Sequence, residues 1–376
     1  MVSINNQQRY KLFTMKKLHL LIIAFLLGGA FNIYAQNPLS LQPNRIWSIE
    51  KANEWYQNQK WLTGTNYIPA NAINQLEMWQ AETFNIERID EELSWAEDLG
   101  FTTMRVFLHS LAYKQDPKGF KERINKFLAV ADKHKIKTML VFFDDCWNKN
   151  AKIGKQPDPQ PGVHNSGWLQ DPGDADSNDR KVITDLEIYL KDILKTFAKD
   201  KRILLWDLYN EPGNTNNGDT SLPLLTKAFE WARAINPEQP ITAGLWSWNL
   251  ENINKLIVAN SDIITYHNYG GTNDHLKVLQ ILKSFGRPMI CTEYMARSHG
   301  SKFENILPML KKENVGAINW GFVAGKTNTI YSWENKIPDG SQPKEWFHDI
   351  LNPDGSAYRK QEVELIKRLN KVLPKN

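Results

Sequence analysis

The chain has 376 residues, of which 41% are hydrophobic and 23% charged, which is ordinary for a globular protein that buries a large core. Two cysteines are too few for a disulfide scaffold. The formal charge of +4 comes from Arg9, Lys11, Lys16 and Lys17 near the N-terminus, and the rest of the chain is formally neutral, so a basic surface for nucleic acid or for anionic membranes is not implied.

The N-terminal segment has the pattern of a secretory signal peptide. Met15 is followed by Lys16 and Lys17, an apolar run through Phe31, and a small residue at Ala35. The apolar run is short and interrupted by glycine, which argues against a membrane span. We therefore expect residues 1–35 to be removed and the mature protein, residues 36–376, to be secreted or periplasmic without a membrane span. The alternative is a buried N-terminal helix.

The rest of the chain alternates strand-like apolar runs with amphipathic segments. Apolar residues at three- and four-residue spacing predict helices over residues 86–100, 120–135, 185–200, 221–235, 301–314 and 362–373. The expected strands cover residues 61–68, 101–108, 136–143, 203–209, 240–246, 262–269, 287–294 and 316–323. Eight such units predict an α/β fold, a single (β/α)8 TIM barrel domain with parallel strands and helices outside. A doubly wound open sheet is disfavoured, because no G-x-G-x-x-G follows the first strand.

Three long segments follow expected strands. They are residues 144–183 after strand three, 212–222 after strand four and 324–356 after strand eight. Barrels of this kind place their chemistry at the C-terminal ends of the strands. We therefore expect the long loops to surround the functional site.

Two glutamates stand at the ends of expected strands. Glu211 belongs to the motif Asn210-Glu211-Pro212 after the fourth strand, and Glu293 ends the seventh strand in I-C-T-E-Y. In a barrel both would point into the same mouth. Two facing carboxyl groups, one protonated and one ionised, are what hydrolysis of a glycosidic bond requires. For either glutamate alone, the alternative is a surface carboxylate.

These motifs carry a resemblance to a known family. L-Y-N-E-P after strand four and T-E-Y on strand seven resemble the clan A glycoside hydrolases, most closely family 5, the cellulase- and mannanase-like retaining β-glycosidases. The resemblance covers the mature chain strand by strand. It implies that Glu211 is the general acid/base and Glu293 the nucleophile, acting through a covalent glycosyl-enzyme intermediate. The implied activity is that of a β-glycoside hydrolase similar to endo-β-glucanases and mannanases.

The same resemblance implies substrate-binding residues. Asn210 would hydrogen-bond the sugar 2-hydroxyl, and Trp320, on strand eight, would form the floor of the sugar subsite. Arg105, expected at the end of strand two, would keep Glu293 ionised; the alternative is an ion pair with Asp207.

His267 and Tyr269, at the end of strand six, match a His-x-Tyr pair of the family. Tyr269 would hydrogen-bond the nucleophile, and His267 would contact a glutamate or the sugar. Either residue could instead be a satisfied core residue.

The sequence also departs from the family pattern. Where family 5 members commonly have a histidine after strand three, this chain reads F-F-D-D-C-W-N, so we expect Asp144, Asp145 and Trp147 to line the site. Trp168, in the long loop that follows, is a further candidate sugar contact. The departure leaves the subfamily and the substrate open.

The expected partner is an oligosaccharide or polysaccharide, and the chemistry needs no cofactor and no metal ion. β-Glucan, β-mannan and xylan all stay possible, as do endo and exo action. Cys146 and Cys291 fall four strands apart in the ring, too far for a disulfide, so we expect free thiols. Two other functions stay open: a carbohydrate-binding barrel that has lost catalysis, and a transglycosylase.

Overall fold

The computed structural model describes residues 41–42, 45–173 and 179–371. The expected signal peptide, residues 1–35, lies outside the described residues. Among the helices that are described, none is long and apolar enough to cross a membrane.

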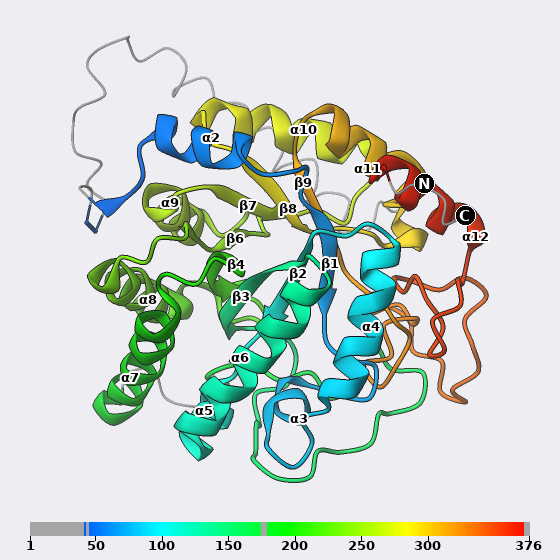
Figure 1. Cartoon of the computed structure of the whole chain (residues 1–376), viewed down its shortest axis with the longest axis horizontal. Coiled ribbons are helices and arrows are strands. Elements are labelled where there is room, and N and C mark those ends of the chain that lie inside the picture. Colours follow the sequence, from blue (N-terminus) through cyan, green and yellow to red (C-terminus); the bar gives the residue numbers. More distant parts are fainter. Residues whose placement is uncertain (1–40, 43–44, 174–178, 372–376) are drawn as a thin grey trace, which may run out of the picture. The chain divides into compact units, whose positions relative to one another are not determined.

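Nine parallel strands form one sheet in the order β5-β4-β3-β2-β1-β9-β8-β7-β6. Ala243 alone separates β5 from β6, so these two share one position and the sheet closes into a barrel of eight positions, as expected from the sequence (Figure 1). The strands are β1 (Thr63–Tyr67), β2 (Thr103–Phe107), β3 (Lys137–Asp144), β4 (Ile203–Asn210), β5 (Ile241–Thr242), β6 (Gly244–Leu245), β7 (Ile264–His267), β8 (Met289–Glu293) and β9 (Gly316–Asn319).

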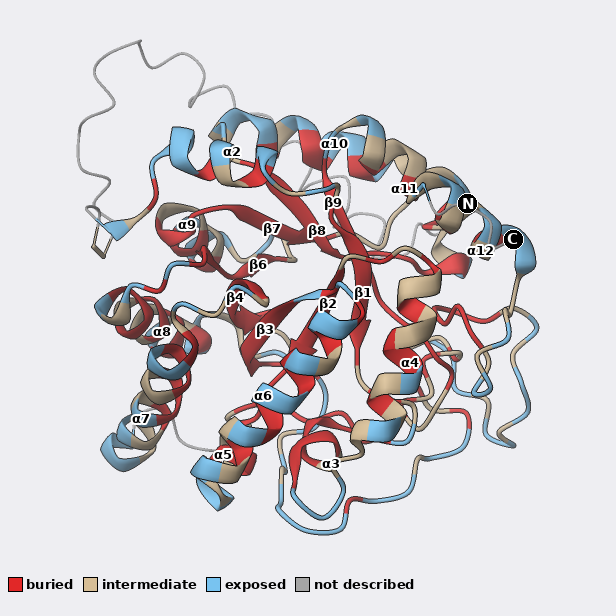
Figure 2. Cartoon of the chain, in the orientation of Figure 1, coloured by how far each residue is buried: buried red, intermediate tan, exposed pale blue. Residues whose placement is uncertain are grey.

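The helices surround the strands and turn their buried faces toward them (Figures 1 and 2). The six helices expected from the sequence are α4 (Ile86–Asp98), α6 (Pro117–Lys133), α7 (Arg180–Phe197), α8 (Leu222–Ile235), α11 (Phe303–Lys312) and α12 (Lys360–Leu369). The structure adds α2 (Ile49–Gln57), α3 (Gln75–Trp79), α5 (Ser110–Gln115), α9 (Glu251–Asn260) and α10 (Thr272–Leu282), with the short 3₁₀ turns η2 (Gly218–Ser221), η3 (Lys283–Phe285) and η4 (Arg297–His299).

Local sequence signals explain where the expected helices begin. The side chain of Asp116 accepts a hydrogen bond from the backbone N–H of Gly119 at 2.9 Å, and Pro117 opens α6. The side chain of Asn85 accepts from the N–H of Arg88 at 2.8 Å at the start of α4. Both contacts satisfy backbone donors that have no partner within the helix.

The barrel interior changes from apolar to polar along the strands. Met139, Leu205 and Ile290 form an apolar cluster with Tyr56 of α2. Two residues further along β4, Asp207 lies on the same face as Leu205, because side chains alternate along a strand. The apolar end closes the barrel, and the polar end is where the strands deliver the candidate functional residues.

Candidate active site

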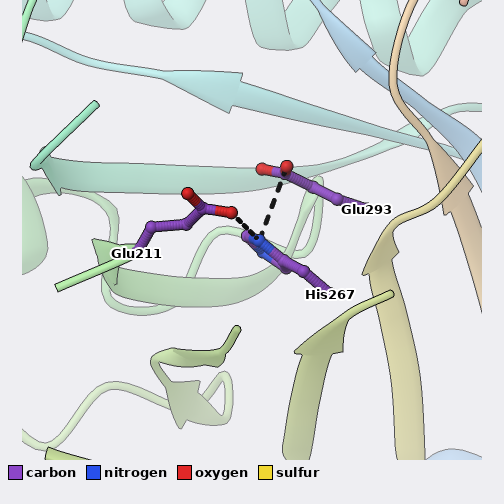
Figure 3. A group of neighbouring side chains, drawn as sticks. All are labelled: Glu211, His267 and Glu293. Atoms are coloured by element: carbon purple, nitrogen blue, oxygen red, sulfur yellow. Dashed lines mark hydrogen bonds and ion pairs between the residues drawn. The ribbon is translucent and has the colours of Figure 1, made fainter. Parts of the chain in front are cut away.

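The barrel brings Glu211 and Glu293 together. Glu211 directly follows β4, Glu293 is the last residue of β8, and His267, the last residue of β7, lies between them (Figure 3). Nδ1 of His267 lies 2.8 Å from Oε1 of Glu211 and 3.4 Å from Oε2 of Glu293. One carboxylate oxygen of each glutamate lies within 4.8 Å of the other. Residues far apart in the sequence therefore share one pocket.

The backbone at Glu211 leaves the strand sharply. Its φ of 44° lies in the left-handed region, which costs on the order of 1–3 kcal/mol for a residue with a side chain. A hydrogen bond stabilises the turn, since the N–H of Gly213 donates to Oδ2 of Asp145 at 2.7 Å. Pro212 has no N–H to continue the ladder. The glutamate is thus presented from a turn that the surrounding contacts hold in place.

Glu293 is held by a cation and a hydroxyl. NH1 of Arg105 donates to its Oε1 at 2.8 Å, and the hydroxyl of Tyr269 donates to its Oε2 at 2.7 Å. Burial raises the pKa of Glu293, while Arg105 and Tyr269 act in the opposite direction. Both contacts are those that the resemblance implies for a nucleophile kept ionised.

Glu211 has neutral partners. Nδ2 of Asn214 donates to its Oε2 at 2.5 Å, and Sγ of Cys146 lies 3.2 Å from the same oxygen. Burial also raises the pKa of Glu211. Because the cationic partner contacts Glu293 and not Glu211, we expect Glu211 to be the carboxyl group that keeps its proton to higher pH.

Two of these contacts were not expected from the sequence. Asn214 follows the N-E-P motif by two residues, and Cys146 was considered only for disulfide pairing. The spacing N-E-P-G-N could have drawn attention to Asn214, because a tight turn returns the chain toward Glu211. Cys146 gave no comparable signal. Both Cys146 and Cys291 are buried and free, as expected.

Arg105 lies in the middle of β2, not at its end as expected, and contacts several site residues. Its Nε and NH2 donate to Oδ2 of Asp207 at 3.0 and 2.8 Å. NH2 also donates to Oδ1 of Asn210 at 2.7 Å, and NH1 to Oδ1 of Asn66 at 2.8 Å. The two partners considered as alternatives, Glu293 and Asp207, are therefore bound at the same time. The guanidinium is buried and its five donors fix the orientation of the residues around it.

Asn210 and Asp144 form a supporting pair. Nδ2 of Asn210 donates to Oδ1 of Asp144 at 2.9 Å, so the amide is held from both ends, by Arg105 and by Asp144. Burial raises the pKa of Asp144 to about 8. Asp144 is 2% exposed. Through this hydrogen bond Asp144 supports Asn210 from behind the site rather than contacting either glutamate.

Asp145 and Trp168 also lie elsewhere than expected. Asp145 turns toward the end of β4 and the loop after it, where it accepts from the hydroxyl of Tyr209 at 2.8 Å and from the N–H of Gly213 at 2.7 Å. Trp168 is 2% exposed, and its Nε1 donates to Oδ2 of Asp144 at 2.8 Å. Neither side chain presents a surface to a sugar. Both instead stabilise the residues that surround the glutamates.

The remaining aromatic residues border the site. Trp320 directly follows β9 and is 8% exposed, with its ring 5.4 Å from the Trp168 ring. Trp147 is 40% exposed, and with Thr215 it lines a cavity of about 850 Å³ in the loop after β3. Trp333, in the loop after β9, packs edge-on against Tyr269 at 4.9 Å. Trp147 and Trp333 are thus more exposed than Trp320.

Glu211, His267 and Glu293 could hold a metal ion by distance alone. Burial lowers the pKa of His267 to about 4, so its imidazole is neutral. However, the guanidinium of Arg105 already neutralises Glu293 at 2.8 Å and would repel a cation. The arrangement fits acid–base and nucleophilic chemistry on a neutral substrate better than metal binding.

The comparisons with known proteins agree with this geometry. The model of the family Cellulase (glycosyl hydrolase family 5) matches residues 72–326. Comparison of the sequence with curated proteins finds no match.

Solved structures of similar fold include two mannanases and a mannosidase. The endo-β-1,4-mannanase from Thermotoga petrophila aligns with a TM-score of 0.53 and 16% identity over 84% of this chain and 78% of that chain. The exo-β-1,4-mannosidase from Opitutaceae bacterium strain TAV5 gives 0.59 and 17% over 83% of this chain and 60% of that one. The endo-1,4-β-mannanase from Rhizomucor miehei gives 0.54 and 13% over 83% and 94%. At these identities the structural likeness shows the fold alone. The family model matches most of the barrel, and the chain therefore belongs to glycosyl hydrolase family 5 and is a glycoside hydrolase.

Proposed function

We propose that this protein is a retaining β-glycoside hydrolase that cleaves β-linked glycans through a covalent glycosyl-enzyme intermediate. The observation that carries the proposal is the separation of the two glutamates, whose nearest oxygens lie within 4.8 Å. Retaining enzymes place the two carboxyl groups about 5–5.5 Å apart, whereas inverting enzymes need roughly 6.5–9.5 Å to fit a water between them. The short distance between the two glutamates therefore supports retention over inversion.

The roles follow from the partners of each carboxyl group. Glu293, ionised beside Arg105, attacks the anomeric carbon and forms an ester bond with it. Glu211 gives its proton to the glycosidic oxygen, which leaves with the bonding electrons as an alcohol. Glu211, now ionised, then takes a proton from water as the water attacks the anomeric carbon. Glu293 leaves as a carboxylate, and both groups regain their starting protonation.

Asn210 and Tyr269 support these steps. The amide of Asn210 is fixed between Arg105 and Asp144 beside the nucleophile, where it can meet the sugar 2-hydroxyl. Tyr269 keeps Glu293 turned toward the anomeric carbon through the 2.7 Å hydrogen bond. Trp320 then borders the subsite that holds the reacting sugar ring.

The substrate class proposed is a β-1,4-linked mannan or glucan, with mannan first. Support comes from the family model, named for cellulases, and from the solved structures named as mannanases and a mannosidase. Residues 36–376 carry no formal net charge, which is consistent with a substrate of neutral sugars.

The test uses aryl β-glycosides with good and poor leaving groups. In Glu211→Ala, we expect poor leaving groups to lose about 10²- to 10⁴-fold in turnover and good ones much less, because only poor ones need the proton. Added azide should restore turnover and give a β-glycosyl azide. Glu293→Gln should lose several orders of magnitude with every leaving group. Glu334→Gln, a 58% exposed side chain, serves as the matched control.

Other outcomes would point to the two alternatives. Binding of glycans with no turnover of any aryl glycoside by the wild type would favour a carbohydrate-binding barrel. Products extended by a sugar acceptor in preference to water would favour a transglycosylase. The intact pair of glutamates with all their expected partners supports hydrolysis over the first alternative.

A further inference from the structure

One side of the barrel mouth is closed by three loops bonded to one another. These are the loops after β1 (residues 68–74), after β3 (145–179) and after β9 (320–359), and we call the described part of this assembly the loop wall. The backbone N–H of Asn165 donates to the carbonyl of Thr327 at 2.8 Å, and that of Ile337 donates to the carbonyl of Gly162 at 3.0 Å. The loops after β3 and β9 therefore meet although two strands, β1 and β2, separate their origins in the barrel.

The loop after β1 joins the other two. The side-chain amide of Asn74 donates to the carbonyl of Gly167 at 3.0 Å, and the N–H of Lys326 donates to the carbonyl of Ala70 at 2.9 Å. The loop wall is thus continuous from β9 to β3.

Trp320 is the first residue of the loop after β9 and packs against the loop after β3 and against β2. The ring of Trp168 packs edge-on against that of Trp320 at 5.4 Å, and Phe107 packs against it at 5.8 Å. The packing here is close, because the cavity left among Trp320, Asn165 and Thr327 has a volume of only about 20 Å³, which suits a water molecule.

The opposite side of the mouth has short connections. Five residues separate β6 from α9, between Leu245 and Glu251, and four separate β7 from α10, between His267 and Thr272. Segments of this length cannot reach across the mouth. A substrate chain can therefore extend on this side.

The chemistry orients the substrate between these two sides. Glu211 on β4 must touch the glycosidic oxygen, so the leaving group lies on its side, toward β4 to β7. The ring that Glu293 attacks lies over Trp320, and further sugars linked to the non-reducing side of that ring would run into the loop wall.

We propose that the enzyme is exo-acting: its glycone side accommodates one sugar ring, and it removes single residues from the non-reducing end of β-linked chains. This inference rests on the proposed glycosidase function and specifies its substrate as a chain end.

The experiment follows the first products from β-1,4-linked manno- and gluco-oligosaccharides of several lengths labelled at the reducing end. The proposal expects free monosaccharide and a labelled chain one residue shorter as the only initial products, and turnover of aryl β-monosaccharides. Initial labelled products shorter by two or more residues would overturn exo action while leaving the glycosidase function intact. No cleavage of any oligosaccharide or aryl glycoside would instead remove the proposed function.

A pair of glycine variants tests whether the loop wall causes the exo action. A Cβ at Gly162 would lie 1.7 Å from the carbonyl oxygen of Ile337, so Gly162→Ala must push the loops after β3 and β9 apart. Gly154, in the same loop, also has a positive φ, but an added Cβ there would meet no atom within 4 Å, so Gly154→Ala is the matched control. We expect internal cleavage products to appear in Gly162→Ala and not in Gly154→Ala. Unchanged products in a folded Gly162→Ala would mean that the loop wall does not set the mode of action.

Discussion

Cys146 and Tyr269 each contact one of the two carboxyl groups and thereby change its pKa. The thiol lies 3.2 Å from Oε2 of Glu211, and the phenol lies 2.7 Å from Oε2 of Glu293. A hydrogen bond donated to a carboxylate favours its charged form and lowers its pKa. Each contact therefore shifts one limb of the pH dependence of activity.

Replacing Cys146 should move the basic limb. Burial raises the pKa of Glu211, and the contact with Cys146 opposes that rise. Cys146→Ala removes the donor, so the pKa of Glu211 rises and the basic limb of kcat/KM moves to higher pH. Cys146→Ser keeps a donor, so its basic limb should lie at the pH of the wild type or below it. Identical basic limbs in all three proteins would show that the thiol does not act on Glu211.

Replacing Tyr269 should move the acidic limb. Tyr269→Phe removes the donor to Glu293, whose pKa then rises, so the acidic limb of kcat/KM moves to higher pH. A hydrogen bond to a charged group contributes about 1.5–3 kcal/mol, which corresponds to a loss of roughly 10- to 100-fold in kcat/KM. The fold should be unaffected, as measured by circular dichroism. A decrease in kcat/KM without a change in the acidic limb would contradict this role.

At the residue scale, the sequence predicted the glutamates better than their surroundings. Glu211 and Glu293 were identifiable because each ends an apolar strand within a specific motif. The position of Asp145 was hard to predict because the direction of a side chain at a strand end reverses with a shift of one residue. Trp168 lies in a long loop, where no periodic pattern indicates which side chains turn inward. The contact of Cys146 with Glu211 joins two loops and leaves no local pattern.

At the scale of elements, α12 and the loop after β9 are held by one buried arginine. Arg297 donates to Glu362 at 3.0 and 2.6 Å and to the carbonyls of Trp346 and Asp349 at 2.8 and 2.9 Å. Arg297 thus connects α12 to the loop after β9, which forms part of the loop wall.

Removing one partner of this ion pair should destabilise the fold. Glu362→Ala leaves a buried guanidinium without its carboxylate, which typically costs 3–5 kcal/mol, so we expect the free energy of unfolding to fall by about that amount. Glu364→Ala, an exposed glutamate in the same helix, should change it by less than about 0.5 kcal/mol. Chemical denaturation measures both. Equal stabilities of the two variants would contradict the account of Arg297.

The strands were predictable because barrel strands are buried on both faces and read as continuous apolar runs. All eight expected strands exist, with every end within four residues of the expected one; most ends are shorter, but β3 and β4 each extend one residue further. The short helices α3 and α5 were not expected, since five or six residues are too few to show a helical period. The loop wall could not be predicted from the sequence either, because its hydrogen bonds join segments that are far apart in the chain, such as Asn165 and Thr327.

At the scale of the whole molecule, one closed barrel places every site residue at the same end. The strands β2, β4, β7 and β8 supply Arg105, Asn210, His267 and Glu293, and the apolar cluster at the other end makes the barrel rigid. A rigid scaffold of this kind keeps the carboxyl groups at a fixed separation.

We also propose that the protein is exported, on the basis of the signal-like segment before Gln36. N-terminal sequencing of the protein recovered from outside the cytoplasm of an expressing bacterium should give a chain that begins near Gln36. Protein that starts at Met1 or Met15 and stays in the cytoplasm would contradict export. The catalytic proposal is independent of this result.

The central claim is that Glu211 and Glu293 face each other at the separation of a retaining enzyme. The most direct test is proton NMR of the sugar released from a β-glycoside in the first minutes of reaction, before the anomers equilibrate. The account predicts that the β-anomer appears first and the α-anomer only later. An α-anomer as the initial product would mean inversion by a single displacement, and would contradict the roles derived for both glutamates.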